Sequence, residues 1–138
     1  MEFDPDRPRG LLSRADREYL LGLKEMEHEQ SKRNAEARIR RRVTEGIVDF
    51  YMLVRNLERK DRKQIFEKGM DDPAFRYGLV GMQTFAYMGM KETGMEFEHV
   101  LGPAITRAEE AYAAEGFDST VDVDVTFDVD VTLGAGLD

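Results

Sequence analysis

The sequence predicts a mainly α protein with a long central helix, a packed helical hairpin and one C-terminal β-strand. Apolar residues recur every three or four positions from Arg38 to Leu57, which is the spacing of one helix face, at Ile39, Val43, Ile47, Phe50, Val54 and Leu57. Valines then alternate with polar residues from Val121 to Thr132, and this alternation indicates a strand with one apolar and one acidic face.

Length and composition limit the class of protein. The chain has 138 residues, which suits one modest hydrophobic core. It has no cysteine, so disulfides, thiolate zinc sites and a cysteine nucleophile are excluded. Acidic residues number 28 against 20 basic ones, which gives a net charge of −8, and most basic residues are arginine. An acidic surface with few lysines stays hydrated in concentrated salt, so the composition favours a halophilic organism over an ordinary acidic protein.

The first half of the chain predicts a short helix followed by a long one. Ser13 followed by Asp16 resembles a capping box, which would open a short helix at 14–21. No glycine or proline occurs from Leu23 until Gly46, so one long helix is predicted from about residue 23 to residue 59. Its first half has a narrow apolar seam, as in a helix that projects or contacts a partner chain, while its second half is expected in the core.

The second half of the chain predicts three further helices. Asp61 is expected to cap a short helix at 62–68. Asp72 and Pro73 supply a cap and a first-turn proline for a helix at 73–92. A last helix should extend to about residue 115. The predicted organisation is a flexible N-terminal arm at 1–12, a helical domain at 13–117 and an acidic tail at 118–138.

Glycines are unusually frequent in the predicted helix at 73–92. Gly78, Gly81 and Gly89 each cost about 1 kcal/mol relative to alanine in a helix interior. We therefore expect another backbone to approach this helix closely.

The predicted strand has no partner elsewhere in the sequence. No turn signal divides 121–133, and no other segment predicts a strand, so the partner is expected to be another chain. Two copies could pair across a twofold axis, or the tail could add to a sheet edge of a different protein. The residues expected to mediate this contact are Val121, Val123, Val125, Phe127, Val129 and Val131. A disordered acidic tail is the alternative, and calcium binding is disfavoured because a straight strand does not wrap an ion.

Two Glu-x-x-His pairs are candidate metal ligands, namely Glu25 with His28 and Glu96 with His99. Helices of di-iron bundles carry this spacing, but such a site also needs a glutamate from each of two further helices. The pairs also arise by chance in so acidic a chain. The favoured interpretation is therefore solvated histidines among carboxylates, and no cofactor is expected.

A basic cluster lies on the predicted long helix and consists of Lys32, Arg33, Arg38, Arg40, Arg41 and Arg42. Arginines on a helix commonly contact phosphates, so nucleic acid is a possible partner. Phosphate contacts weaken steeply as salt rises, however, and Glu36 and Glu45 interrupt the cluster. A solvated face with pairs such as Glu36 with Arg40 is the favoured alternative.

The sequence gives no support for an enzyme. The serines, Ser13, Ser31 and Ser119, lie in polar settings, and no glycine-rich phosphate loop precedes a helix. The start lacks the apolar stretch of a signal peptide, and the least polar segment, 79–90, is shorter than the roughly 20 residues of a membrane span. We therefore expect a cytoplasmic protein without a membrane anchor.

A resemblance to a known group of proteins supports the expectation of a halophilic organism. The segment Arg9-Gly10-Leu11-Leu12-Ser13-x-x-Asp16-Arg17-x-Tyr19-Leu20-x-Gly22, together with the arginine-rich run and Leu57 to Arg62, resembles a group of small uncharacterised proteins of haloarchaea. The resemblance covers roughly residues 9 to 66 and implies no activity. The leading hypothesis is a non-enzymatic interaction protein that self-associates or binds a protein partner through its long helix and C-terminal strand. Alternatives are a nucleic-acid-associated regulator and a metal-binding helical bundle.

Overall fold

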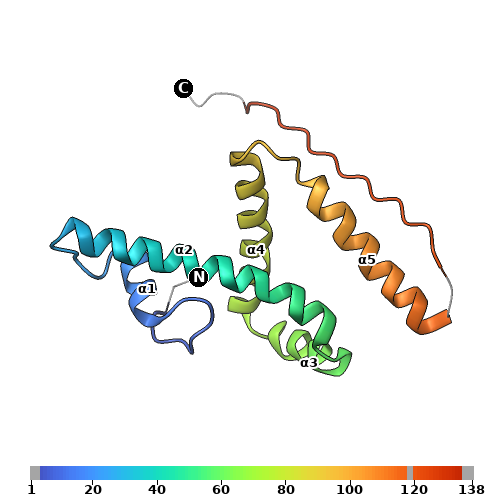
Figure 1. The fold of residues 1–138 in the computed structure, drawn as a ribbon, viewed down its shortest axis with the longest axis horizontal. Helices are drawn as coiled ribbons and strands as arrows, with labels where there is room; N and C mark the ends of the chain where they lie inside the picture. The colour runs from blue at the N-terminus through green and yellow to red at the C-terminus, as the bar shows by residue number, and fades with distance from the viewer. Residues whose placement is uncertain (1–3, 118–119, 135–138) are drawn as a thin grey trace. The chain divides into compact units, whose positions relative to one another are not determined.

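The computed structural model describes residues 4–117 and 120–134 and places five α-helices along them. These are α1 (Arg14–Leu20), α2 (Glu29–Asn56), α3 (Arg59–Gly69), α4 (Pro73–Glu92) and α5 (Glu98–Phe117) (Figure 1). The prediction of a mainly α protein is confirmed. The chain forms two compact units, Met1–Phe75 and Arg76–Asp138, which are described separately below.

The first unit begins with the capping box that the sequence predicts. The Asp16 amide donates to Ser13 Oγ at 3.2 Å, and the Ser13 amide donates to Asp16 Oδ2 at 2.9 Å. These reciprocal bonds satisfy amides that would have no partner in the first turn of α1. The Gly22 backbone then adopts a φ of +72°, a left-handed conformation that suits glycine and turns the chain after α1.

The long helix starts later than predicted. α2 begins at Glu29 and has 28 residues, with His28 at its N-cap. The preceding residues form a polar connection after Gly22, since they offer no apolar stripe to hold them as a helix. The first half of α2 has a packing partner within its own chain, because α1 lies against it (Figure 1).

The next two helices differ in how well their starts were predicted. α3 starts at Arg59, three residues before the predicted position, so Asp61 lies in its first turn instead of at its cap. α4 starts at Pro73 as predicted, and the Asp72 carboxylate accepts from the Ala74 amide at 2.9 Å. The rings of Phe66 and Phe75 meet edge to face, with their centroids 5.6 Å apart, and connect α3 to the start of α4.

The second unit contains most of α4, all of α5 and the tail. Gly94, with a φ of +74°, makes the turn between the helices. Pro103 lies inside α5. The prediction of a packed hairpin is wrong, because the backbones of α4 and α5 do not contact each other along their lengths. An aromatic cluster of Tyr87, Phe97 and Phe127 lies next to the turn instead, with centroid separations of 5.6 to 6.5 Å.

The predicted C-terminal strand is wrong. Residues 120–134 form no strand, and no strand occurs in any other described part of the chain. A strand requires a ladder of backbone hydrogen bonds with a neighbour, and alternation of side chains does not supply that neighbour. Side-chain contacts hold the tail instead, because Phe127 joins the aromatic cluster and its amide donates to Glu98 Oε1 at 3.1 Å.

The glycines of α4 do not face another backbone within the described chain. A Cβ built on Gly78, Gly81 or Gly89 would meet nothing within 4 Å. The expectation of a close backbone approach is therefore not met by any contact of this chain that the structure describes.

Over the described residues, no helix combines the length and the apolar character that crossing a bilayer requires.

Candidate functional site

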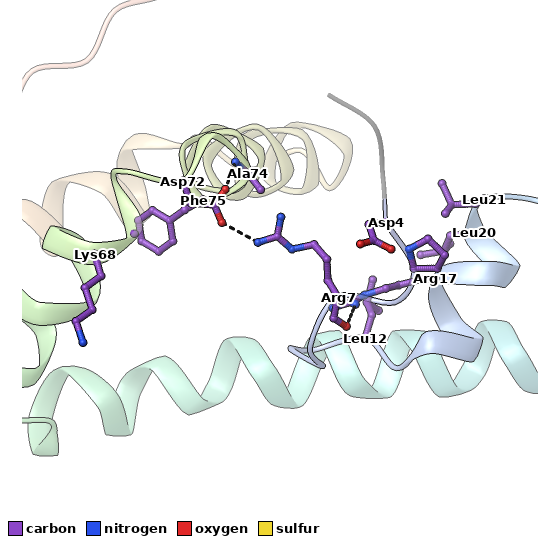
Figure 2. Close-up of a pocket in the computed structure, with 12 residues that line it drawn as sticks. Asp4, Arg7, Leu12, Arg17, Leu20, Leu21, Lys68, Asp72, Ala74 and Phe75 are labelled. Atoms are coloured by element: carbon purple, nitrogen blue, oxygen red, sulfur yellow. Dashed lines mark hydrogen bonds and ion pairs between the residues drawn. The ribbon is translucent and has the colours of Figure 1, made fainter.

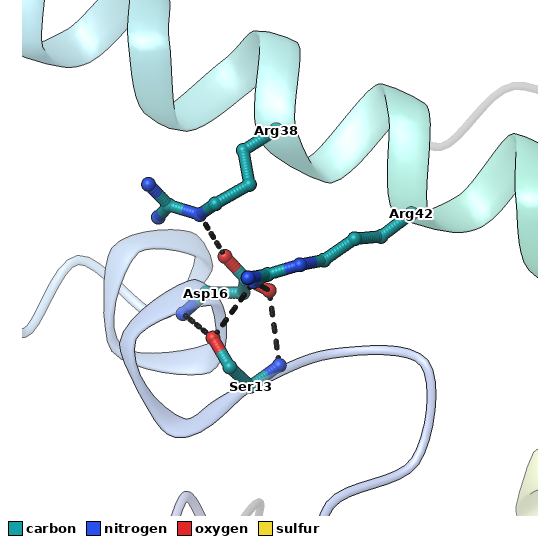
Figure 3. A network of polar contacts seen from close by, with 4 residues as sticks. All are labelled: Ser13, Asp16, Arg38 and Arg42. Carbon is teal, nitrogen blue, oxygen red and sulfur yellow. Dashed lines mark hydrogen bonds and ion pairs between the residues drawn. The ribbon is translucent and has the colours of Figure 1, made fainter.

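A buried carboxylate joins α1 to α2. Asp16 is fully buried and accepts from Arg38 Nε at 2.9 Å and from Arg42 Nη1 (Figure 3). Arg42 Nη1 also donates to Ser13 Oγ at 3.0 Å. Burial alone would raise the pKa of Asp16, but hydrogen bonds from the Ser13 amide and the two guanidinium groups outweigh it and hold that pKa well below its usual range. We call Ser13, Asp16, Arg38 and Arg42 the Asp16 network.

Further contacts fix the segment around α1. The Tyr19 hydroxyl donates to Glu36 Oε1 at 2.9 Å, and this bond raises the pKa of Tyr19. Arg17 donates to the carbonyl oxygens of Arg7 and Pro8 at 2.6 and 3.1 Å. Leu11 covers Gly46 of α2 so closely that a Cβ there would collide with Leu11 Cδ2. The N-terminal segment of the resemblance therefore has a clear structural role: it attaches α1 and its leading loop to α2.

A pocket of about 760 Å³ lies on the same unit (Figure 2). Its walls include the apolar side chains of Leu12, Leu20, Leu21 and Phe75. Charged groups border it, namely Arg7, Arg17, Lys68, Asp4 and Asp72. The volume lies within the range of about 300–1,000 Å³ that is typical of ligand sites.

The pocket depends on contacts between distant segments. Arg7 Nη2 lies 2.7 Å from Asp72 Oδ2, which ties the N-terminal segment to the start of α4. Sequence reasoning missed the pocket because its lining comes from residues 4–21 and 68–75, which no periodicity connects. The sequence contains one signal for this pocket. Leu12, Leu20 and Leu21 are apolar residues in or beside α1, and the contact between α1 and α2 does not account for them.

The predicted basic cluster separates into two sets. Arg38 and Arg42 point to Asp16, whereas Lys32, Arg33, Arg40 and Arg41 are exposed. Two of the six candidate phosphate ligands therefore hold a carboxylate of their own chain.

The predicted metal ligands do not form helical pairs. Glu25 lies in the connection before α2 and His28 is its N-cap, while Glu96 precedes α5 and His99 lies in its first turn. The two pairs belong to different units. Among residues 4–117 and 120–134, no three His, Asp or Glu side chains come together as a metal site.

The predicted contact residues of the tail also divide into two sets. Val123, Val125 and Phe127 are half-buried, whereas Val121, Val129 and Val131 are exposed. This alternation still places Val123, Val125 and Phe127 on one side of an extended backbone.

Exposed apolar side chains are concentrated on the second half of α2, which the sequence places in the core. We call residues 47–54 the apolar α2 segment. It exposes Ile47, Val48, Phe50, Tyr51, Met52, Leu53 and Val54, and Val54 has 73% of its surface accessible. Across the part of the chain that the structure describes, the buried apolar side chains are Ala35 and Ala113.

No curated protein and no solved structure matches the chain. A family model described as a domain of unknown function, DUF8102, matches residues 11–138, and the chain belongs to this family.

Proposed function

We propose that this protein is a non-enzymatic assembly protein of the cytoplasm of a halophile, which works as a homo-oligomer or as a subunit of a larger complex. The observation that carries the proposal is the apolar α2 segment. Its seven exposed apolar side chains point in all directions around the helix axis. A helix that is apolar all round belongs in the interior of a larger assembly.

The size of this exposed apolar surface determines how much its burial can stabilise an assembly. Burial of a Val, Leu, Ile, Phe or Met side chain contributes about 1.5–3 kcal/mol. Contiguous exposed apolar surface of this kind marks an interaction site on a soluble protein. A second copy can supply a matching surface, because a twofold axis brings the same segment of both chains together.

The charge of the chain fits assembly in concentrated salt. Each copy carries a net charge of −8, so copies repel one another in dilute buffer. In molar salt the Debye length falls to about 3 Å, and this repulsion is screened while apolar contacts persist. The acidic composition supports the halophilic part of the proposal in the same way.

The direct test changes one exposed side chain of the apolar α2 segment. Val54→Asp should weaken self-association at least about tenfold, because it places an unpaired carboxylate in an apolar contact. Light scattering during size-exclusion chromatography in 2 M KCl measures the mass across a dilution series. Ser31→Asp is the matched control, since it adds the same charge at an exposed polar position of α2. Equal masses for both variants, with unchanged helical circular dichroism, would contradict the proposal.

A second candidate function is nucleic-acid association, which the exposed Lys32, Arg33, Arg40 and Arg41 favour. A variant that tests this candidate must leave Arg38 and Arg42 intact, because their bonds to Asp16 attach α1 to α2. The double variant Arg40→Glu, Arg41→Glu should lose retention on a DNA column at about 0.2 M KCl if these residues contact phosphate. A wild-type chain that is not retained, or a variant retained equally, would remove this candidate.

A further inference from the structure

The tail changes character along its length. Up to Phe127 it is held on its own unit by the aromatic cluster and the bond to Glu98. Beyond Phe127 its apolar side chains become progressively more exposed: Val129 has 50% of its surface accessible, Val131 has 76% and Leu133 has 99%. The segment 128–133 is therefore an extended peptide that is anchored at Phe127 and whose apolar side chains lose their cover toward Leu133.

The chemistry of this segment is distinctive. Val129, Val131 and Leu133 alternate with polar residues, so an extended backbone presents them on one side about 7 Å apart. Asp128 and Asp130 together give the segment two negative charges. An apolar cavity with cations at its rim is the complement of such a peptide.

The pocket of the first unit has this complementary chemistry. Leu12, Leu20, Leu21 and Phe75 provide apolar walls, and three cations lie around them against two carboxylates. This gives the rim a net positive charge in a chain that is otherwise strongly acidic. Arg7 and Arg17 already have partners, and Lys68 belongs to the lining together with Phe75 and Gly69.

We propose that the pocket of one copy receives segment 128–133 of a second copy. Val131 and Leu133 enter between Leu20 and Phe75, and Asp130 lies beside Lys68. This inference rests on the proposed self-assembly and adds a second contact between the copies, made by the tail of one and the pocket of the other. Each copy carries one tail and one pocket, so a reciprocal exchange closes a twofold dimer without leaving an unfilled pocket. The family match covers residues 11–138, which include segment 128–133 and the pocket residues other than Asp4, Pro5 and Arg7.

The absence of cysteine from the sequence allows a crosslinking test in the full-length chain. Two single variants, Leu20→Cys and Leu133→Cys, are mixed and oxidised mildly. A disulfide between them can form only between two copies. We expect the mixture to give more covalent dimer on a non-reducing gel than either variant oxidised alone, and this excess, the heterodimer, should be at least about fivefold larger than with Val121→Cys in place of Leu133→Cys. Val121 is an exposed residue of the anchored part of the tail and is the matched control.

Two outcomes of the crosslinking experiment would overturn the inference. Heterodimer yields equal to those of the Val121→Cys control would overturn the inference. A double variant, Leu20→Cys with Leu133→Cys, that closes an internal disulfide in preference to crosslinking copies would overturn it as well. In either case, a wild-type chain that remains oligomeric by light scattering would leave the proposed assembly through α2 in place.

Discussion

Replacing Asp16 by alanine should lower the free energy of unfolding by about 3 kcal/mol. The substitution removes the acceptor of Arg38 and Arg42 and leaves two guanidinium groups facing each other without a counter-charge. Breaking a buried ion pair from one side costs about 3–5 kcal/mol, and the partial exposure of both arginines places this case at the lower end. Urea unfolding followed by circular dichroism at fixed protein concentration measures the change.

Two comparisons separate the Asp16 network from ordinary surface charge. Glu18→Ala, also in α1, removes an exposed pair with Arg14 and should cost less than about 1 kcal/mol. Acid titration gives the second comparison with Asp16→Asn. The folded pKa of Asp16 is depressed, so its contribution is complete above the unfolded value of about 3.9 and is lost as pH falls toward the folded pKa. The stability difference between wild type and Asp16→Asn should therefore shrink below about pH 4; a constant difference would contradict the network.

Replacing Phe127 by alanine should detach the anchored part of the tail. Phe127 contacts Phe97 and Tyr87, and aromatic pairs contribute about 0.5–1.5 kcal/mol each in addition to the burial of the ring. A total loss of about 2 kcal/mol corresponds to a roughly 30-fold increase in the population of the detached tail. Hydrogen exchange of the Phe127-region amides, measured by NMR at fixed pH, reports this population.

The control for this experiment lies in the same segment. Thr126 is exposed beside Phe127, so Thr126→Ala should leave the exchange rates within about twofold of wild type. Equal acceleration by both substitutions would show that the ring contacts do not hold the tail.

Local signals in the sequence predicted the features that depend on near neighbours. Ser13 and Asp16 lie three residues apart and Asp72 is next to Pro73, so the starts of α1 and α4 follow from short-range bonds. The start of α3 was misplaced because Asp61 suits both a cap and a first turn.

Features that depend on distant residues were not predictable in this way. Arg38 and Arg42 suggested a phosphate site because their partner Asp16 lies 22 and 26 residues away in sequence. The alternating tail predicted a strand, but alternation sets only the direction of side chains, and the contacts of Phe127 with Tyr87, Phe97 and Glu98 are made by side chains. The stripe on α2 predicted a core, whereas the structure leaves the apolar α2 segment exposed.

The mass of the wild-type chain in solution tests the central claim most directly. Light scattering in 2 M KCl should be recorded during size-exclusion chromatography at several loading concentrations, with absorbance at 260 and 280 nm to detect nucleic acid. Assembly through the apolar α2 segment predicts a nucleic-acid-free species of at least twice the chain mass of 15.8 kDa, which persists on dilution to low micromolar concentration. A mass of one chain at every concentration would contradict self-assembly and limit the proposal to a complex with a different protein.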